Sequence, residues 1–128
     1  MKTRMTSYLS GALAMLLAGS AIAARLPFNQ AQYEQAVAAG KPVVVYFHAD
    51  WCPTCRAQQP IVDKLLGEPQ FMSVTLFEAD FDTETALEKS LKVTQQSTFV
   101  VFKLGHEATR STGQTQEPAI RAVLQKAL

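Results

Sequence analysis

The sequence predicts one α/β domain: a mixed central sheet of about four or five strands with helices on both faces. From residue 29 onward, strand-like segments alternate with segments of helical periodicity, which is the pattern of a sheet covered by helices. The run Pro42–His48 is apolar on both of its faces, as a central strand requires. The chain has 128 residues, of which 48% are hydrophobic and 18% charged. One compact domain is therefore expected, rather than two domains or a disordered chain.

The first 23 residues have the three parts of a secretory signal peptide. Two basic residues precede an apolar run at 9–18, and small residues lead up to Ala23, after which the cut is expected. The apolar run is shorter than the roughly 20 residues of a membrane span, so an uncleaved anchor is the less favoured alternative. Residues 24–128 then form the mature thiol-bearing domain. We expect it in the bacterial periplasm, where cysteines are oxidised unless a dedicated system reduces them.

The first helix and the first strand follow from local signals. Asn29 can cap a helix that runs to about Ala39, and Gly40 is expected to stop it. The strand Pro42–His48 comes next, with proline at the first position, where a strand tolerates it.

A helix after Trp51 is predicted from an apolar stripe with a period of 3.6 residues. Its core side comprises Ile61, Val62, Leu65 and Leu66, and its solvent side comprises Arg56, Gln58, Asp63 and Lys64. Pro60 lies inside this helix and is expected to kink it, because proline removes a backbone donor.

The remaining elements are shorter. They are a strand at Val74–Asp80, a helix capped by Asp82 or Thr83 and ending near Leu91, a strand at Thr98–Lys103, a turn at 104–106 and a hairpin partner at Ala108–Thr112. The closing helix has Pro118 in its first turn, and its apolar stripe comprises Ile120, Val123, Leu124, Ala127 and Leu128.

The two cysteines stand in the segment Trp51-Cys52-Pro53-Thr54-Cys55, between the central strand and a helix. Cysteines three apart on a first helical turn place both sulfurs on one side, close enough for a disulfide. The free N–H groups and positive dipole end of the helix stabilise a thiolate, and Pro53 presets the first helical φ. We expect Cys52, at the exposed end, to have the lower pKa and to be the nucleophile. Cys55, one turn further in, is then suited to attack Cys52 and so resolve the mixed disulfide that Cys52 has formed with another thiol.

Other uses of the cysteine pair are less favoured or stay open. A structural disulfide closing so short a loop would stabilise the domain only weakly. Zinc needs about four ligands, and His48 and His106 are the only histidines. A carrier of a soft ion such as Cu(I), with Met72 as a possible further ligand, and a module that holds one client covalently stay open. No metal site is assigned, and no cofactor is expected beyond the redox-active cysteine pair.

The mature chain resembles the thioredoxin family over essentially its whole length. The segment VVVYFHADWCPTCRAQQP resembles that family's active-site segment, and FVVFKLGHE resembles its strand–turn–strand. The stretch GKPVVVYFHADWC is also similar to the C-terminal periplasmic domain of the transmembrane thiol:disulfide interchange reductase. The resemblance implies the thioredoxin fold and a protein-disulfide oxidoreductase, with reduction as the preferred direction.

The resemblance also implies site residues and partners. Client contacts fall on Trp51, Gln96, Ser97 and Thr98, and Pro53 and Thr54 support the thiol chemistry. The substrates are protein disulfides and thiols, and the electrons come from a transmembrane thiol reductant. A monomer is expected. A net charge of +1 without a basic block argues against nucleic acid as a partner.

Three positions depart from the family pattern. Ser97 stands where the family has a cis-proline before a threonine, in the loop that faces the sulfurs. A cis bond before a residue other than proline is costly, so the 96–97 peptide is expected to be trans. Tyr46 stands where the family has a buried acid, six residues before the first cysteine. Glu78 stands where the family has the lysine that accompanies this acid. We hypothesise that Glu78 supplies the displaced carboxylate as a buried, unpaired proton shuttle. The alternation of side chains along a strand is equally consistent with a Glu78 that points outward to solvent.

Overall fold

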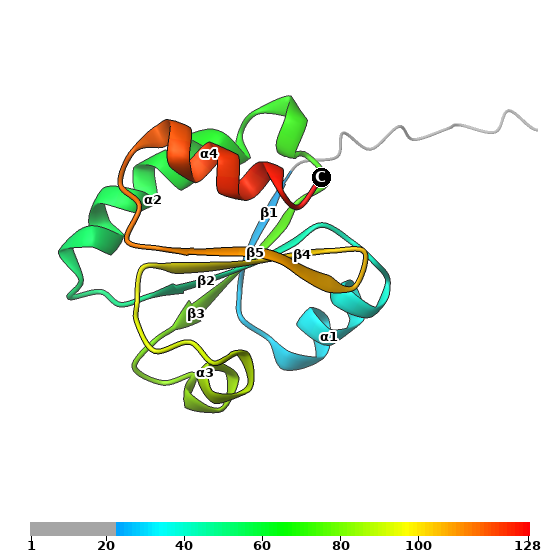
Figure 1. Ribbon diagram of the computed structural model, residues 1–128, viewed down its shortest axis with the longest axis horizontal. Coiled ribbons are helices and arrows are strands. Elements are labelled where there is room, and N and C mark those ends of the chain that lie inside the picture. Colours follow the sequence, from blue (N-terminus) through cyan, green and yellow to red (C-terminus); the bar gives the residue numbers. More distant parts are fainter. Residues whose placement is uncertain (1–22) are drawn as a thin grey trace, which may run out of the picture.

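A five-stranded mixed sheet runs through the centre of the computed structural model, which describes residues 23–128 (Figure 1). The elements are β1 (Ala24–Pro27), α1 (Gln30–Ala38), β2 (Val43–His48), α2 (Pro53–Leu66), the short 3-10 helix η1 (Pro69–Phe71), β3 (Thr75–Asp80), α3 (Thr85–Leu91), β4 (Thr98–Lys103), β5 (His106–Thr112) and α4 (Glu117–Gln125). Except for Ala23, the expected signal peptide lies outside the described residues. No helix within 23–128 combines the length and apolar composition that crossing a bilayer requires.

The strand order is β1-β3-β2-β4-β5, with β2 in the middle. Strands β1, β3 and β2 are parallel, whereas β4 and β5 are antiparallel to their neighbours. Helices α2 and α4 cover one face of the sheet, and α1 and α3 cover the other (Figure 1). The predicted mixed sheet with helices on both faces is therefore confirmed. The apolar run of β2 is fully buried from Val43 to Phe47, as a central strand requires.

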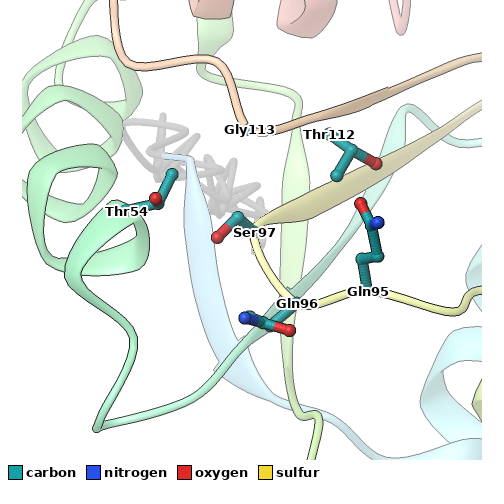
Figure 2. A pocket seen from close by; sticks show the side chains of 6 residues that line it. All are labelled: Thr54, Gln95, Gln96, Ser97, Thr112 and Gly113. Carbon is teal, nitrogen blue, oxygen red and sulfur yellow. The ribbon is translucent and has the colours of Figure 1, made fainter.

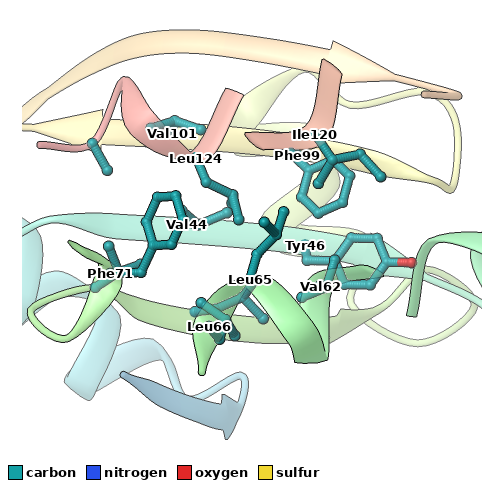
Figure 3. Packing of buried hydrophobic residues seen from close by; sticks show 13 residues of the cluster. Val44, Tyr46, Val62, Leu65, Leu66, Phe71, Phe99, Val101, Ile120 and Leu124 are labelled. Atoms are coloured by element: carbon teal, nitrogen blue, oxygen red, sulfur yellow. The ribbon is translucent and has the colours of Figure 1, made fainter. Parts of the chain in front are cut away.

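Alternate side chains of the central strands enter two separate cores. Val44 and Tyr46 of β2 pack against α2 and α4, as Figure 3 shows, together with Phe99 of β4. Val45 and Phe47 point to the opposite face and pack toward α1 and α3. This alternation fixes Tyr46 on the same face as α2, the helix that carries the cysteines.

Strand β1 was not predicted. Its four residues, Ala24–Pro27, include an arginine and a proline, and they lack the β-branched and aromatic run that identifies a strand. The segment is a strand because it pairs in parallel with β3, from Ala24 beside Thr75 to Pro27 beside Glu78. This edge pairing is a long-range contact, and nothing in the local sequence indicates it.

Several predicted boundaries are confirmed and others shift. The Asn29 side chain accepts from the Gln32 N–H at 3.0 Å and caps α1 as expected. Neither Asp82 nor Thr83 caps α3, which begins at Thr85 after a turn in which Asp80 accepts the Asp82 N–H. Leu128 does not join the apolar stripe of the last helix and is 39% exposed.

The β4–β5 turn contains two residues rather than three. Leu104 and Gly105 have φ of 50° and 85°, and His106 already pairs with Lys103 at the start of β5. Positive φ at both positions is the geometry of a type I′ turn, whose twist matches the flanking strands.

Candidate active site

Cys52 is the N-cap of α2, and Pro53 is its first helical residue, as predicted. The Cys52 sulfur takes the role that a serine or aspartate oxygen has at many helix starts, since it accepts the Cys55 N–H at 3.1 Å. Both cysteines are free thiols in this structure. The central strand β2 ends four residues before Cys52 and thereby fixes where α2 begins.

The two thiols differ in acidity although they are equally buried. Both are 1% exposed, so the prediction that Cys52 occupies an exposed end is wrong. Burial by itself would raise the pKa of Cys52, but hydrogen bonds from Cys55, Ser97 and backbone N–H groups outweigh it, and the pKa is lowered. Burial and the hydrogen bond with Cys52 raise the pKa of Cys55. Hydrogen bonds thus lower the pKa of Cys52 against the effect of burial, whereas burial and the hydrogen bond with Cys52 together raise the pKa of Cys55.

Ser97 lies against both sulfurs. Its Oγ is 3.1 Å from Cys52 Sγ and 3.1 Å from Cys55 Sγ. Every peptide bond of the described residues is trans, including the bond between Gln96 and Ser97, as predicted. Ser97 has a φ of 61°, which lies in the left-handed region that non-glycine residues seldom adopt. The backbone at this position thus holds an uncommon conformation while the side chain contacts the thiols.

Gln58 connects the cysteine helix to the Ser97 loop, and the sequence did not predict this. It was expected on the solvent side of α2, yet it is fully buried. Its Nε2 donates to the carbonyls of Gln114 at 2.8 Å and Ser97 at 3.3 Å, and its Oε1 accepts the Tyr46 hydroxyl at 2.9 Å. A buried amide satisfied in this way fixes the relative position of α2, β2 and the loop.

Tyr46 places a phenol where the family pattern has a buried acid. Its hydroxyl donates to Gln58 and lies 3.4 Å from the carbonyl oxygen of Cys55. Burial, together with the negative charge of Cys55, raises the pKa of Tyr46, so the phenol stays neutral near neutral pH. The sequence placed Tyr46 correctly relative to the cysteines, but it did not indicate the partner of the hydroxyl.

Glu78 does not meet the condition set by the proton-shuttle hypothesis. It pairs with Tyr46 across the β2–β3 register and so lies on the face that α2 covers. However, its carboxylate forms an ion pair with Arg25 of β1, and its side chain is 25% exposed. The expectation of a buried, unpaired carboxylate is therefore wrong. Strand β1, which has no local signal in the sequence, supplies the cation that neutralises Glu78.

The predicted client-contact residues are only partly brought together. Thr54, Gln96 and Ser97 line a pocket of about 360 Å³ beside the sulfurs, with the Ser97 hydroxyl on the side that faces α2 (Figure 2). Trp51 is 55% exposed, and its indole N–H donates to Asp82 at 2.8 Å. The Thr98 side chain is 3% exposed and bonds the Gln95 carbonyl at 2.8 Å. The Thr98 side chain therefore shapes the loop, and the expected contact of this residue with a client stays a prediction.

Met72, named above as a further ligand for a soft ion, lies away from the sulfurs. Within residues 23–128, no group of three or more His, Cys, Asp and Glu side chains could hold a metal ion. Met72 follows η1, beyond the C-terminal end of α2, whereas the cysteines are at its N-terminal end. A helix of 14 residues is about 21 Å long, so Met72 cannot reach them.

Comparison with known proteins gives a consistent result. The family model described as thioredoxin matches residues 24–126. Thioredoxin-2 of Saccharomyces cerevisiae is 31% identical over 86 residues, which are 66% of this chain and 81% of the yeast protein. The thioredoxin of Chlamydia trachomatis is 26% identical over 98 residues, 77% of this chain and 93% of that one. The crystal structure of Trxlp from Edwardsiella tarda has a TM-score of 0.77 and 36% identity, covering 79% of this chain and 98% of that chain.

Proposed function

Because the chain belongs to the thioredoxin family, whose members are thiol:disulfide oxidoreductases, we propose that it reduces disulfides of client proteins in the bacterial periplasm. The observation that carries this proposal is the geometry at the start of α2. There the Cys52 sulfur accepts the Cys55 N–H and contacts the Ser97 hydroxyl, while Cys55 lies one turn further in. These hydrogen bonds lower the pKa of Cys52, which favours its thiolate, and the second thiol is placed to complete the exchange.

The proposed reaction has two exchange steps. The Cys52 thiolate attacks one sulfur of the client disulfide, that S–S bond breaks, and the other client sulfur leaves as a thiolate and takes a proton. Cys55 loses its proton and attacks Cys52 Sγ in the mixed disulfide, so the second client sulfur also leaves as a thiol. The client gains two electrons and two protons, and the protein ends with a Cys52–Cys55 disulfide.

The surface around the sulfurs supports a protein client. Trp51 presents an exposed indole that its bond to Asp82 holds in place. The pocket lined by Thr54, Gln96 and Ser97 is open to solvent and is lined by no charged side chain. We assign the residues next to the client cysteine to this pocket, and the indole to the outer side of the contact.

We place the protein in the periplasm on the strength of the N-terminal signal pattern. A cut after Ala23 leaves β1 whole, because the strand begins at Ala24 and the Ala24 N–H already bonds the Val74 carbonyl at 3.1 Å. A reductase in an oxidising compartment needs electrons from inside the cell. The proposal therefore includes a transmembrane thiol reductant as electron donor and a monomeric mature domain, with no cofactor beyond the cysteine pair.

An equilibrium redox titration of the exported protein against dithiothreitol tests the proposal. Trp51 is the only tryptophan and adjoins Cys52, so its fluorescence should report the two-electron transition. A potential near the thioredoxin value of about −270 mV is expected for a reductant, whereas a value near about −120 mV would make the protein an oxidant. The Cys55→Ser variant should accumulate a mixed disulfide with a client protein, and the Cys52→Ser variant should form none. No reversible transition would instead favour metal carriage or covalent client binding.

A further inference from the structure

Ser97 Oγ is placed to exchange a proton with both sulfurs of the site. It lies 3.1 Å from each, and the Ser97 residue is 4% exposed. A hydroxyl has one proton to donate and lone pairs that accept. When Cys52 is a thiolate it can only accept, so the hydroxyl donates to Cys52 and accepts from the Cys55 thiol. The three atoms then form a continuous chain of hydrogen bonds from Cys55 to Cys52.

The structure holds this hydroxyl in place from the backbone. The Ser97 carbonyl accepts the Gly113 N–H at 3.0 Å and the Gln58 amide at 3.3 Å. These bonds come from the segment after β5 and from α2, so they fix the loop on two sides. They maintain the left-handed φ of 61°, a backbone conformation that is unfavourable for a non-glycine residue. An uncommon backbone conformation held in this way at a reactive site suggests a role for the side chain.

Two other acid–base groups near the site, Tyr46 and Glu78, are engaged elsewhere, whereas the buried Nδ1 of His48, whose ring lies 5.6 Å from that of Tyr46, has no hydrogen-bond partner among the described residues. The Tyr46 hydroxyl donates its proton to Gln58, and burial raises its pKa. Glu78 is ion-paired with Arg25. From α2, the titratable groups that face Ser97 Oγ are the two cysteines themselves, and the adjoining Thr112 and Gly113 carry none. Resolution by Cys55 nevertheless requires that its thiol lose a proton.

We propose that the Ser97 hydroxyl relays the proton of Cys55 to the departing client sulfur when the mixed disulfide is resolved. This step rests on the proposed reductase function. Cys55 Sγ attacks Cys52 Sγ, the bond between Cys52 Sγ and the client sulfur breaks, and the client sulfur leaves with the electron pair. The Cys55 proton passes to Ser97 Oγ, and the proton that Oγ carried passes to the client sulfur. Ser97 ends unchanged, and the products are the Cys52–Cys55 disulfide and a client thiol.

The client sulfur has a route to this hydroxyl. In the mixed disulfide it is bonded to Cys52 Sγ at about 2.05 Å. Ser97 also lines the open pocket with Thr54, so a client sulfur that enters from this side comes next to Oγ (Figure 2). When a donor thiolate reduces the Cys52–Cys55 disulfide, the same path runs backwards. Cys55 then leaves as a thiolate and takes its proton from Ser97.

The pH dependence of resolution distinguishes a relay from a purely structural role. The reduced protein is mixed with glutathione disulfide, and rapid acid quenching with mass spectrometry follows the Cys52–glutathione mixed disulfide as Cys55 resolves it. The variants are Ser97→Ala and Ser97→Gly, the second of which accepts the positive φ without strain. Ser90→Ala, which removes a hydroxyl that bonds Leu87 in α3, is the control.

A relay requires both Ser97 variants to resolve the mixed disulfide at least about tenfold more slowly than wild type at neutral pH, since acid–base groups contribute roughly 10²–10⁴-fold. At an alkaline pH high enough to convert Cys55 to the thiolate without a relay, the rates should converge. A slowing of equal size at both pH values, or no slowing in Ser97→Gly, would overturn the relay and leave the reductase proposal intact. Failure of the wild-type protein to form the Cys52–Cys55 disulfide at all would overturn the reductase proposal itself.

Discussion

The replacement Gln58→Leu removes the buried amide that joins three parts of the site. Leucine keeps a similar volume but has no polar atom, so the bonds to Gln114, Ser97 and Tyr46 are all lost. The Ser97 carbonyl keeps the Gly113 N–H, and the carbonyl of the exposed Gln114 can turn to water. The Tyr46 hydroxyl is fully buried and keeps only a long contact of 3.4 Å with the Cys55 carbonyl.

These losses give an expected decrease in the free energy of unfolding. An unpaired buried hydroxyl costs about 1–3 kcal/mol, and each of the two amide–carbonyl bonds contributes about 0.5–1.5 kcal/mol. The sum is about 2–6 kcal/mol, a large part of the roughly 5–15 kcal/mol that stabilises a domain. A variant Gln59→Leu at the next position of α2 is the matched control. Gln59 is partly exposed and accepts one hydrogen bond, from Arg25 at 2.9 Å, so its replacement is expected to cost less, about 0.5–1.5 kcal/mol.

A double-mutant cycle in urea then isolates the pair of Gln58 and Tyr46. Tyr46→Phe removes the hydroxyl that Gln58→Leu leaves unpaired, so the double variant should lose less stability than the sum of the single variants. The expected coupling is about 1–2 kcal/mol, within the range measured for residues in one hydrogen-bond network. Equal losses in Gln58→Leu and Gln59→Leu, or purely additive effects in the cycle, would refute this account of the buried amide.

Two further predictions concern parts of the fold away from the cysteines. Hydrogen bonds from Arg121 and Gln70 lower the pKa of Glu68 from 4.5 to about 2. Because this pKa is lower in the folded state, the ionised Glu68 stabilises the fold above about pH 4.5, and this stabilisation is lost as the pH falls toward 2. The urea midpoint of unfolding should therefore depend less on pH across this range in Glu68→Gln than in the wild type. Lys92 ends α3 with a φ of 55°, in the left-handed region that glycine adopts without strain. Lys92→Gly should therefore raise the free energy of unfolding by about 0.5–1 kcal/mol. The control Lys89→Gly, inside the helix, should lower it by about 1 kcal/mol.

The parts of the fold with a local signal could be predicted. The continuous apolar run before His48 indicated a central strand, and the structure buries Val43–Phe47 completely. Asn29 indicated a helix start, and its side chain makes the capping bond. Both signals involve residues close together in the chain. Strand β1 has no such signal, since it exists through its pairing with β3.

The cysteine motif indicated where the chemistry is located but not what surrounds it. Gln58 is polar and was assigned to the solvent side of its helix. Its spacing from Val62 and Leu65, at i+4 and i+7, places it on the buried stripe and could have identified it. Its carbonyl partners lie 39 and 56 residues further along the chain, so the hydrogen bonds themselves could not be predicted. The Glu78 hypothesis failed for a related reason, because its cation belongs to the unpredicted β1.

The contact of one serine with two sulfurs makes thiol reactivity a property of the finished fold. The oxygen that bonds Cys52 lies 45 residues away in sequence, and β2 and β4 must pair before it reaches the sulfur. A nascent chain or a short peptide with the same two cysteines has ordinary thiols. Until β2 and β4 pair, the two cysteines therefore lack the contact with the Ser97 hydroxyl. The part of the lowered pKa of Cys52 that comes from Ser97 arises only when the sheet closes, so the acidity of this thiol reports that the fold is complete.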